Sequence, residues 1–438
     1  MTSPAPPPGI LVSRPPRRSW ALPLLGGLFV APHILLPLDW GFPRLPILGH
    51  PLNPAAAFSI ALFGMLVLRS RGAILEELRR PYCMLQSAYF VVLILASLRA
   101  ASPLVALQLS LVYFCVFVLN YVSLLHLIQN GGARTFVLAV AVVGLAAAAV
   151  GVLQGIFGVR FGAYEAWYAQ YFQSSAADPL AAGSRGIGTL NNPILYGMAM
   201  VLLVPYVLEI RRIWLRLAVF TVLFVAAVLT GSRTVLLVGA VFLAGGILVY
   251  RWRALWLVPV LLCGLIAGVQ SLGGWKQASE DPRVRFLVAR VGLGGDELGA
   301  SARGNIAIRQ EALRQGAREV LDNWGPGTWL AGKGMLTAAA IGQKVSADYS
   351  TVDNAFFGIF YEKGLIGAAL FLWSFASLLR STRSVARRTL HWWAPIGLLA
   401  SGLAFNFDAF STFNILAVGS MAVITTLGES HVARRQGS

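Results

Sequence analysis

Long apolar runs separated by short arginine-rich segments dominate the chain. A helix crosses a bilayer with roughly 20 mostly apolar residues and pairs all its backbone polar groups internally. This rule predicts about twelve transmembrane helices and an all-α polytopic membrane protein. The predicted spans are 20–38, 52–68, 82–98, 103–127, 135–157, 191–208, 216–230, 234–250, 254–272, 354–379, 391–407 and 411–427.

The charge content of the chain supports a lipid environment. Only 12% of the 438 residues are charged and 57% are hydrophobic, whereas a soluble domain carries about 25% charged residues. A formal net charge of +17 would suggest nucleic-acid binding in a soluble protein. Here the basic residues lie between apolar segments, where they report membrane orientation, so nucleic acid is not needed to explain them.

The basic residues occupy alternate connections, which predicts that both termini are cytoplasmic. The cytoplasmic segments would contain Arg14, Arg17, Arg18, Arg69, Arg71, Arg79, Arg80, Arg134, Arg211, Arg212, Arg216, Arg251, Arg253, Arg380, Arg383, Arg387, Arg388, Arg434 and Arg435. The expected organisation is a disordered basic N-terminus over 1–19, nine spans within 20–272, a large external loop over 273–353, three spans within 354–427, and a cytoplasmic tail over 428–438.

The two long external segments are 158–190 and 273–353, and the second holds ten Lys and Arg residues. Long loops escape the orientation rule, so this charge is either a solvated face or a surface for an anionic substrate. Within the loop, Arg303–Asn323 reads as an amphipathic helix whose apolar stripe is Ile306, Leu313 and Val320, with Ala317 and Leu321 beside it. Trp324 and Trp329 follow, and they could line a sugar site or rest at the membrane interface.

No metal or cofactor motif is evident. Gly327–Lys333 matches most of a phosphate-binding loop, but the next residue is Gly334 in place of Ser or Thr, and no parallel sheet is predicted. No D-x-D or H-E-x-x-H pattern and no Cys/His cluster occurs, and the five histidines are scattered. We therefore expect no metal and no cofactor.

Polar motifs gather where predicted spans meet the outside. Arg233 lies in a tight turn between two apolar spans, where an unpaired arginine costs a few kcal/mol. It either snorkels to the interface or binds an anion, aided by the backbone N–H groups of Gly231 and Ser232. The other motifs contain Arg185 and Asn192, Arg303 at the start of the loop helix, Asp353 and Asn354 before the tenth span, Glu362 and Lys363 within it, and Asn406 and Asp408 between the last two spans.

Three relationships are expected at the tenth span. Asn354, Gly358 and Glu362 share one helix face. Glu362 and Lys363 do not face each other in a regular helix, so each would need another partner, and a structural ion pair is the favoured role. Asp353 is a candidate base and also a candidate helix N-cap.

Together these motifs resemble the O-antigen polymerase and O-antigen ligase superfamily, which includes Wzy-type polymerases, over roughly residues 130–370. The principal match is Asp353-Asn354 followed by Glu362, Gly364, Leu365, Ile366 and Gly367; the R-G-x-G-T-x-N-N-P, T-G-S-R and A-R motifs support it. The resemblance implies a GT-C-like glycosyltransferase of the bacterial inner membrane, with its active site facing the periplasm.

The resemblance also implies the chemistry. The donor would be an oligosaccharide on undecaprenyl diphosphate, and an acceptor hydroxyl would displace the diphosphate without a metal. Arg185, Arg233 and Arg303 would bind the diphosphate, since arginine stays protonated and grips phosphate oxygens in a fork. Arg233, Arg303 and Asp353 would be catalytic, with Asn192, Asn354 and Glu362 in support. A chain-length co-polymerase is a possible partner, and the protein is expected to be a monomer.

The resemblance leaves the acceptor open. O-antigen ligases resemble H-x-H-N where this chain has Thr351-Val352-Asp353-Asn354, and that difference favours a polymerase of lipid-linked repeat units. A ligase that transfers glycan to lipid A core is the first alternative. A polysaccharide flippase or other transporter is the second, although no repeat between the two halves of the chain supports it.

Overall fold

In a computed structural model, the structure describes residues 21–35, 54–157, 188–190, 193–230, 232–250, 297–345, 354–403 and 414–436. These residues form helices and their connections, with no strand among them, as expected for an all-α protein. The predicted span 254–272, Arg185, Asn192, Asp353, and the turn containing Asn406 and Asp408 lie outside the described residues.

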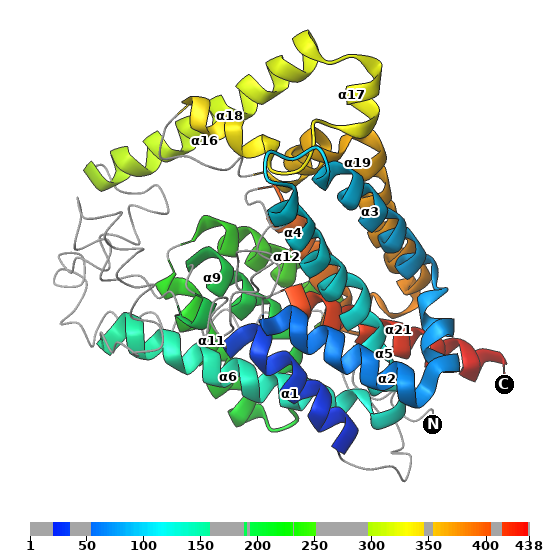
Figure 1. Cartoon of the computed structure of the whole chain (residues 1–438). Helices are drawn as coiled ribbons and strands as arrows, with labels where there is room; N and C mark the ends of the chain where they lie inside the picture. Colours follow the sequence, from blue (N-terminus) through cyan, green and yellow to red (C-terminus); the bar gives the residue numbers. More distant parts are fainter. Residues whose placement is uncertain are drawn as a thin grey trace.

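The first half of the described chain is a succession of apolar helices (Figure 1). Proline in the first turn begins several of them, because its fixed φ suits that position and no N–H is lost from the helix. The elements are α1 (Ala21–Leu35), α2 (Pro54–Leu78), α3 (Pro81–Ser97), α4 (Pro103–Phe114), the π-helical turn η1 (Cys115–Leu119), α5 (Asn120–Gly131), α6 (Ala133–Phe157), η2 (Gly188–Leu190), α9 (Pro193–Leu202), α10 (Val204–Leu208), α11 (Ile213–Leu229) and α12 (Arg233–Tyr250).

The second half contains the loop helices and the last apolar helices. The elements are α16 (Glu297–Asn323), α17 (Pro326–Ala331), α18 (Thr337–Val345), α19 (Ala355–Ser381), η4 (Arg383–Val385), η5 (Leu390–Trp393), α20 (Ala394–Ser401) and α21 (Ile415–Gln436). Figure 1 shows α16, α17 and α18 together at one end of the molecule, next to the ends of α3, α4 and α19.

Four helical segments have the length and apolar composition that crossing a membrane requires, within the part of the chain that the structure describes: 56–78, 103–130, 133–155 and 355–381. Five shorter apolar helices accompany them, over 25–35, 81–97, 194–208, 213–229 and 234–250. These helices overlap predicted spans, although 56–78 continues ten residues beyond the predicted end at 68 and includes Arg69 and Arg71 of the predicted connection. The total of twelve and the orientation in the membrane stay predictions.

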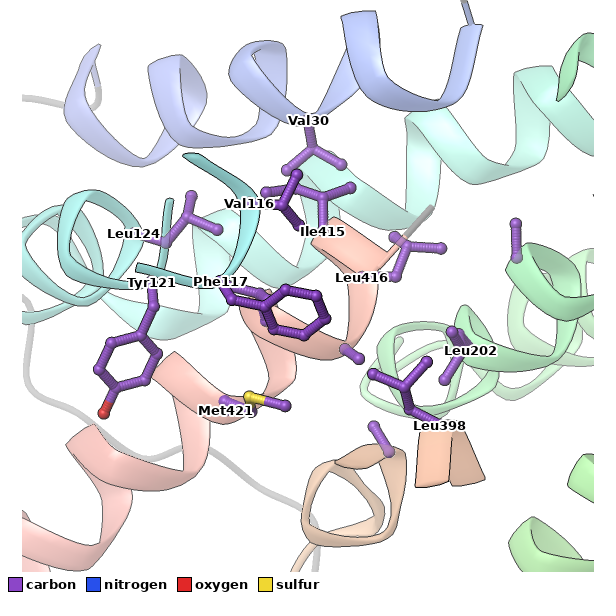
Figure 2. Close-up of a cluster of buried hydrophobic side chains, with 14 of the residues drawn as sticks. Val30, Val116, Phe117, Tyr121, Leu124, Leu202, Leu398, Ile415, Leu416 and Met421 are labelled. Atoms are coloured by element: carbon purple, nitrogen blue, oxygen red, sulfur yellow. The ribbon is translucent and has the colours of Figure 1, made fainter. Parts of the chain in front are cut away.

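The core joins helices that are far apart in the sequence. Figure 2 shows Val30 of α1, Phe117 of η1, Leu202 of α9, Leu398 of α20 and Met421 of α21 in one buried cluster. Some buried polar groups join these helices. For example, the hydroxyl of Tyr206 donates to the carbonyl of Leu416 over 2.6 Å. The core thus fixes the ends of the helices that carry the candidate site.

Helix α19 is broken at Gly364, where φ is 67° and ψ is −170°. Residues 365–381 run beside α3, with Gln86 donating to the hydroxyl of Ser374 over 2.7 Å. Residues 355–363 precede the break. The predicted tenth span over 354–379 agrees with this helix, but the sequence did not predict the break at Gly364. The break arises because the turn after α17 bonds to the backbone of α19 at this point.

The last helix extends beyond its predicted span. Helix α21 continues to Gln436, so part of the predicted tail 428–438 is helical. Its Glu429 binds Arg80 over 2.5 Å and accepts from Gln129 over 2.9 Å, while Arg388 donates to Nδ1 of His431 over 3.3 Å. These contacts bring the ends of α2, α5 and α21 together.

Candidate functional site

Arg233 and Asn354 belong to the same end of the helix bundle. Arg233 is the first residue of α12, and α20 runs antiparallel to α12, with Gly397 facing Val238 and Phe242. The end of α20 therefore lies toward Arg233, and there the N–H of Ala355 donates to the carbonyl of Gly402 over 2.7 Å. The starts of α12 and α19, more than a hundred residues apart in sequence, thus lie at the same end of the bundle.

Asn354 is the N-cap of α19. Its side-chain oxygen accepts from the N–H of Phe357 over 2.9 Å, and its amide nitrogen donates to the carbonyl of Leu403 over 3.3 Å. The sequence offered Asp353 as the cap, and the cap is one residue later. Capping is therefore not the role of Asp353, whose own position lies outside the described ranges.

The predicted loop helix is present and longer than expected, since α16 begins at Glu297 and contains Arg303. Its buried face has Ala312, Gly316 and Val320, and Leu313 packs beside them. Leu321 is exposed, so its predicted place on the apolar stripe is wrong. This face packs on α18 and on the first part of α19, where Gly316 admits the ring of Phe357.

The opposite face of α16 is basic. It carries Arg314 and Arg318, whose side chains are exposed, and Arg314 lies 3.9 Å from Glu311. Arg309 is exposed as well, but it lies one turn before Ala312 on the side that packs. A helix that buries one face on α18 and α19 thus presents two arginines outward, in line with the basic character that the sequence predicted for the large loop.

Glu362 and Lys363 lie at the break in α19 and are buried. They form an ion pair with each other, with 3.1 Å between Nζ and Oε2. The prediction that they do not face each other is wrong, because the regular helix ends at Gly364 and both side chains are enclosed there. The other carboxylate oxygen of Glu362 accepts from the N–H of Ala338, in α18, over 3.4 Å. Both residues are thus in an ion pair, and its structural role stays a prediction.

Glu319 connects α16 to α18, to α19 and to the turn after α17. Its carboxylate pairs with Lys333, lies 3.4 Å from Nζ of Lys344, and accepts from the hydroxyl of Tyr361 over 2.7 Å. Burial disfavours the charged form of Glu319, but the donors Lys333 and Tyr361 outweigh that effect, so the pKa of Glu319 lies below its usual range. We call Glu319, Lys333, Lys344 and Tyr361 the Glu319 cluster.

An aromatic group lies beside the Glu319 cluster. Trp324 is buried and stacks on Phe360 with 5.5 Å between ring centroids. Trp329, in α17, lies edge-on to Trp324 at 6.0 Å and is 37% exposed. Only Trp329 of the two thus has substantial exposed surface for a sugar or a lipid.

Residues 331–335 join α17 to α3 and α19 through main-chain atoms. The N–H groups of Lys333 and Gly334 donate to the carbonyls of Tyr361 and Glu362 over 2.9 and 3.0 Å. Arg99 donates to the carbonyls of Ala331 and Gly332 over 2.6 and 3.1 Å. We call residues 331–335 the docking turn.

Sequence reasoning missed Arg99, Glu319 and Tyr361, because each contact joins distant segments. The one signal was the glycine spacing at Gly332, Gly334 and Gly364, all of which adopt positive φ. The pattern Gly327–Lys333, rejected as a phosphate-binding loop, forms α17 and the docking turn. Among the described residues, no three His, Cys, Asp or Glu side chains are grouped as metal ligands.

No protein-family model and no curated protein sequence matches this chain. The class that the described residues define is an all-α protein with helices long and apolar enough to cross a membrane. Any more specific assignment rests on the motifs and on their placement.

Proposed function

We propose that this protein is an inner-membrane glycan polymerase that joins polyprenyl-diphosphate-linked repeat units on the periplasmic face. The observation that carries the proposal is the packing of the basic helix α16 on α18 and on the first part of α19, the helix that begins two residues after Asp353. A basic helix packed near the start of α19 suits a reaction with an anionic leaving group.

The proposed orientation of the protein in the membrane follows from the distribution of basic residues. Arg80, Arg388 and the end of α21 belong to one end of the bundle, and the orientation rule assigns such basic ends to the cytoplasm. Figure 1 shows α16 at the opposite end from the C-terminus, which would then be the periplasmic end. Lipid-linked glycan flipped across the membrane would reach the protein there.

In the proposed reaction, a hydroxyl of one repeat unit attacks the anomeric carbon of another. The bond between that carbon and the diphosphate oxygen breaks, and the diphosphate takes the electron pair. Arg185, Arg233 and Arg303 would stabilise the leaving charge, and Asp353 would accept the hydroxyl proton. Asn192, Asn354 and Glu362 would support these groups, and Asn354 and Glu362 are suited to this by their hydrogen bonds to neighbouring elements.

The test is product size. The purified protein is given a polyprenyl-diphosphate-linked repeat unit with divalent metal chelated and no other acceptor, and the glycans are separated on a gel. A ladder of repeats is expected. A single transfer that appears only when lipid A core is supplied would indicate a ligase instead, and no product with either acceptor would favour a transporter.

The matched variants are Asp353→Asn and Asn354→Asp. Asp353→Asn keeps the size of the side chain and removes the proton acceptor, so the ladder should be lost. Asn354→Asp keeps an N-cap oxygen for Phe357, so the fold should be retained. A full ladder from Asp353→Asn would exclude Asp353 as the base.

A further inference from the structure

Helix α17 lies at the level where two apolar helices end. The N–H of Met335, just after α17, donates to the carbonyl of Ala96 in the last turn of α3 over 3.0 Å. Backbone atoms of Leu330 and Gly332 pack against Gly364, where α19 begins to run beside α3. The end of α17 is therefore in contact with the end of α3 and with the break in α19.

The surface around this contact is apolar and exposed. Leu365 and Ile366 follow the break in α19 and are 55% and 47% exposed, and Leu95 and Leu98 at the end of α3 are exposed as well. On α17, Leu330 is 49% exposed and Trp329 is partly exposed. Exposed apolar side chains on membrane helices face lipid, and Leu330 of α17 adds to this group of exposed apolar side chains, with Arg99 bonded to the backbone between α3 and α17.

The backbone polar groups of the docking turn are hydrogen-bonded, as a non-helical segment at membrane depth requires. The N–H groups of the four residues from Gly332 to Met335 all have backbone acceptors, namely the carbonyls of Thr328, Tyr361, Glu362 and Ala96. The carbonyls of Ala331, Gly332 and Gly334 accept from the side chains of Arg99 and Thr337. Irregular backbone is tolerated next to hydrocarbon only when its polar groups are satisfied within the protein.

We propose that α17 is a membrane-dipping element, with Trp329 and Leu330 inserted among the lipids of the leaflet on the α16 side. Tryptophan favours the boundary between headgroups and acyl chains, and leucine favours the acyl chains. The apolar contact and the main-chain bonds of the docking turn would hold the basic helix α16 close to the lipid headgroups. This inference does not depend on the enzymatic proposal.

The experiment measures the depth of a nitroxide label in protein reconstituted into phosphatidylethanolamine and phosphatidylglycerol vesicles. The label is placed at Leu330→Cys after the native Cys83, Cys115 and Cys263 are replaced by alanine. Oxygen, which concentrates in the acyl region, and a water-soluble nickel chelate are compared as relaxing agents. Ile366→Cys, of similar exposure, serves as the lipid control, and the exposed Arg314→Cys on α16 serves as the water control.

The expected result is that oxygen relaxes the label at position 330 more than nickel does, as at position 366. Relaxation dominated by nickel, as at position 314, would overturn the proposal. If Leu330→Cys fails to fold, Gly327→Cys provides the same comparison one helical turn away, because a Cβ at Gly327 meets no atom within 4 Å.

Discussion

The hydroxyl of Tyr361 donates to the carboxylate of Glu319 over 2.7 Å, which ties α19 to α16 at a point 42 residues away in sequence. Lys333 and Lys344 pair with the same carboxylate, from the docking turn and from α18. One acid thus receives donors from three other elements, so it fixes how α16 sits on the broken helix.

Replacing Glu319 by Gln should loosen this junction. The amide still accepts from Tyr361, but both ion pairs are lost, which should cost about 1 kcal/mol of unfolding free energy because the site is partly exposed. The expected result is a lower unfolding temperature and a weaker polymer ladder. Glu311→Gln, on the same helix with only a 3.9 Å contact to Arg314, is the control. Equal effects of the two changes would contradict the assigned role.

A methyl group at Gly364 should destabilise the protein. Its φ of 67° disfavours any side chain, and a Cβ there would overlap the backbone of Leu330 and Gly332. We expect Gly364→Ala to lower the unfolding free energy by about 3 kcal/mol, measured by chemical denaturation in detergent micelles. Gly239→Ala in α12, where no atom lies within 4 Å, should leave stability unchanged or raise it. A harmless Gly364→Ala would mean that the docking turn is not held at this point.

Charge reversal tests the arginine site. Arg233→Glu and Arg303→Glu should each reduce polymer formation by at least about a hundredfold, because in the proposed reaction each would remove a fixed cation beside the leaving diphosphate. Protein abundance in the membrane should be normal. Arg211→Glu, an exposed arginine beyond the far end of α10, should retain polymer. Unchanged polymer from both Arg233→Glu and Arg303→Glu would refute the diphosphate-binding role.

Glu209 predicts a pH dependence of stability. It follows α10 and is buried near Arg216, Arg134 and Tyr250. Burial raises the pKa of its carboxyl from 4.5 to about 7, although the two arginines act to lower it. Between these values the folded protein holds a proton that the unfolded chain has lost. Stability should therefore fall as pH rises from about 4.5 to about 7.

Thermal unfolding across that pH range checks this prediction. Glu209→Gln should flatten the dependence, because its amide does not titrate. Glu76→Gln, at an exposed acid in the last turns of α2, should leave the slope as it is. The same slope in the wild type and in Glu209→Gln would assign the pH dependence to another group.

The apolar helices could be predicted from the sequence because membrane insertion is a local property of about 20 residues. The amphipathic helix α16 was predictable for the same reason, since its period lies within one segment. The break at Gly364 was not, because Gly332 and Gly334 of a distant loop impose it. The pairing of Glu362 with Lys363 follows from that break. Asp353 and Asn354 are equally suited to capping, so only the backbone position decides between them.

The docking turn recognises α19 through carbonyl and N–H groups, which every residue other than proline supplies alike. Substitution of Leu330, Lys333 or Met335 would therefore keep the main-chain groups that bond the docking turn to α19. A side chain at Gly332 or Gly364 would instead prevent their close approach. Two related chains could share the attachment and have almost no side-chain identity there. The sequence would then retain only the three glycines at matching separations, and a sequence comparison would not detect the attachment from so few residues.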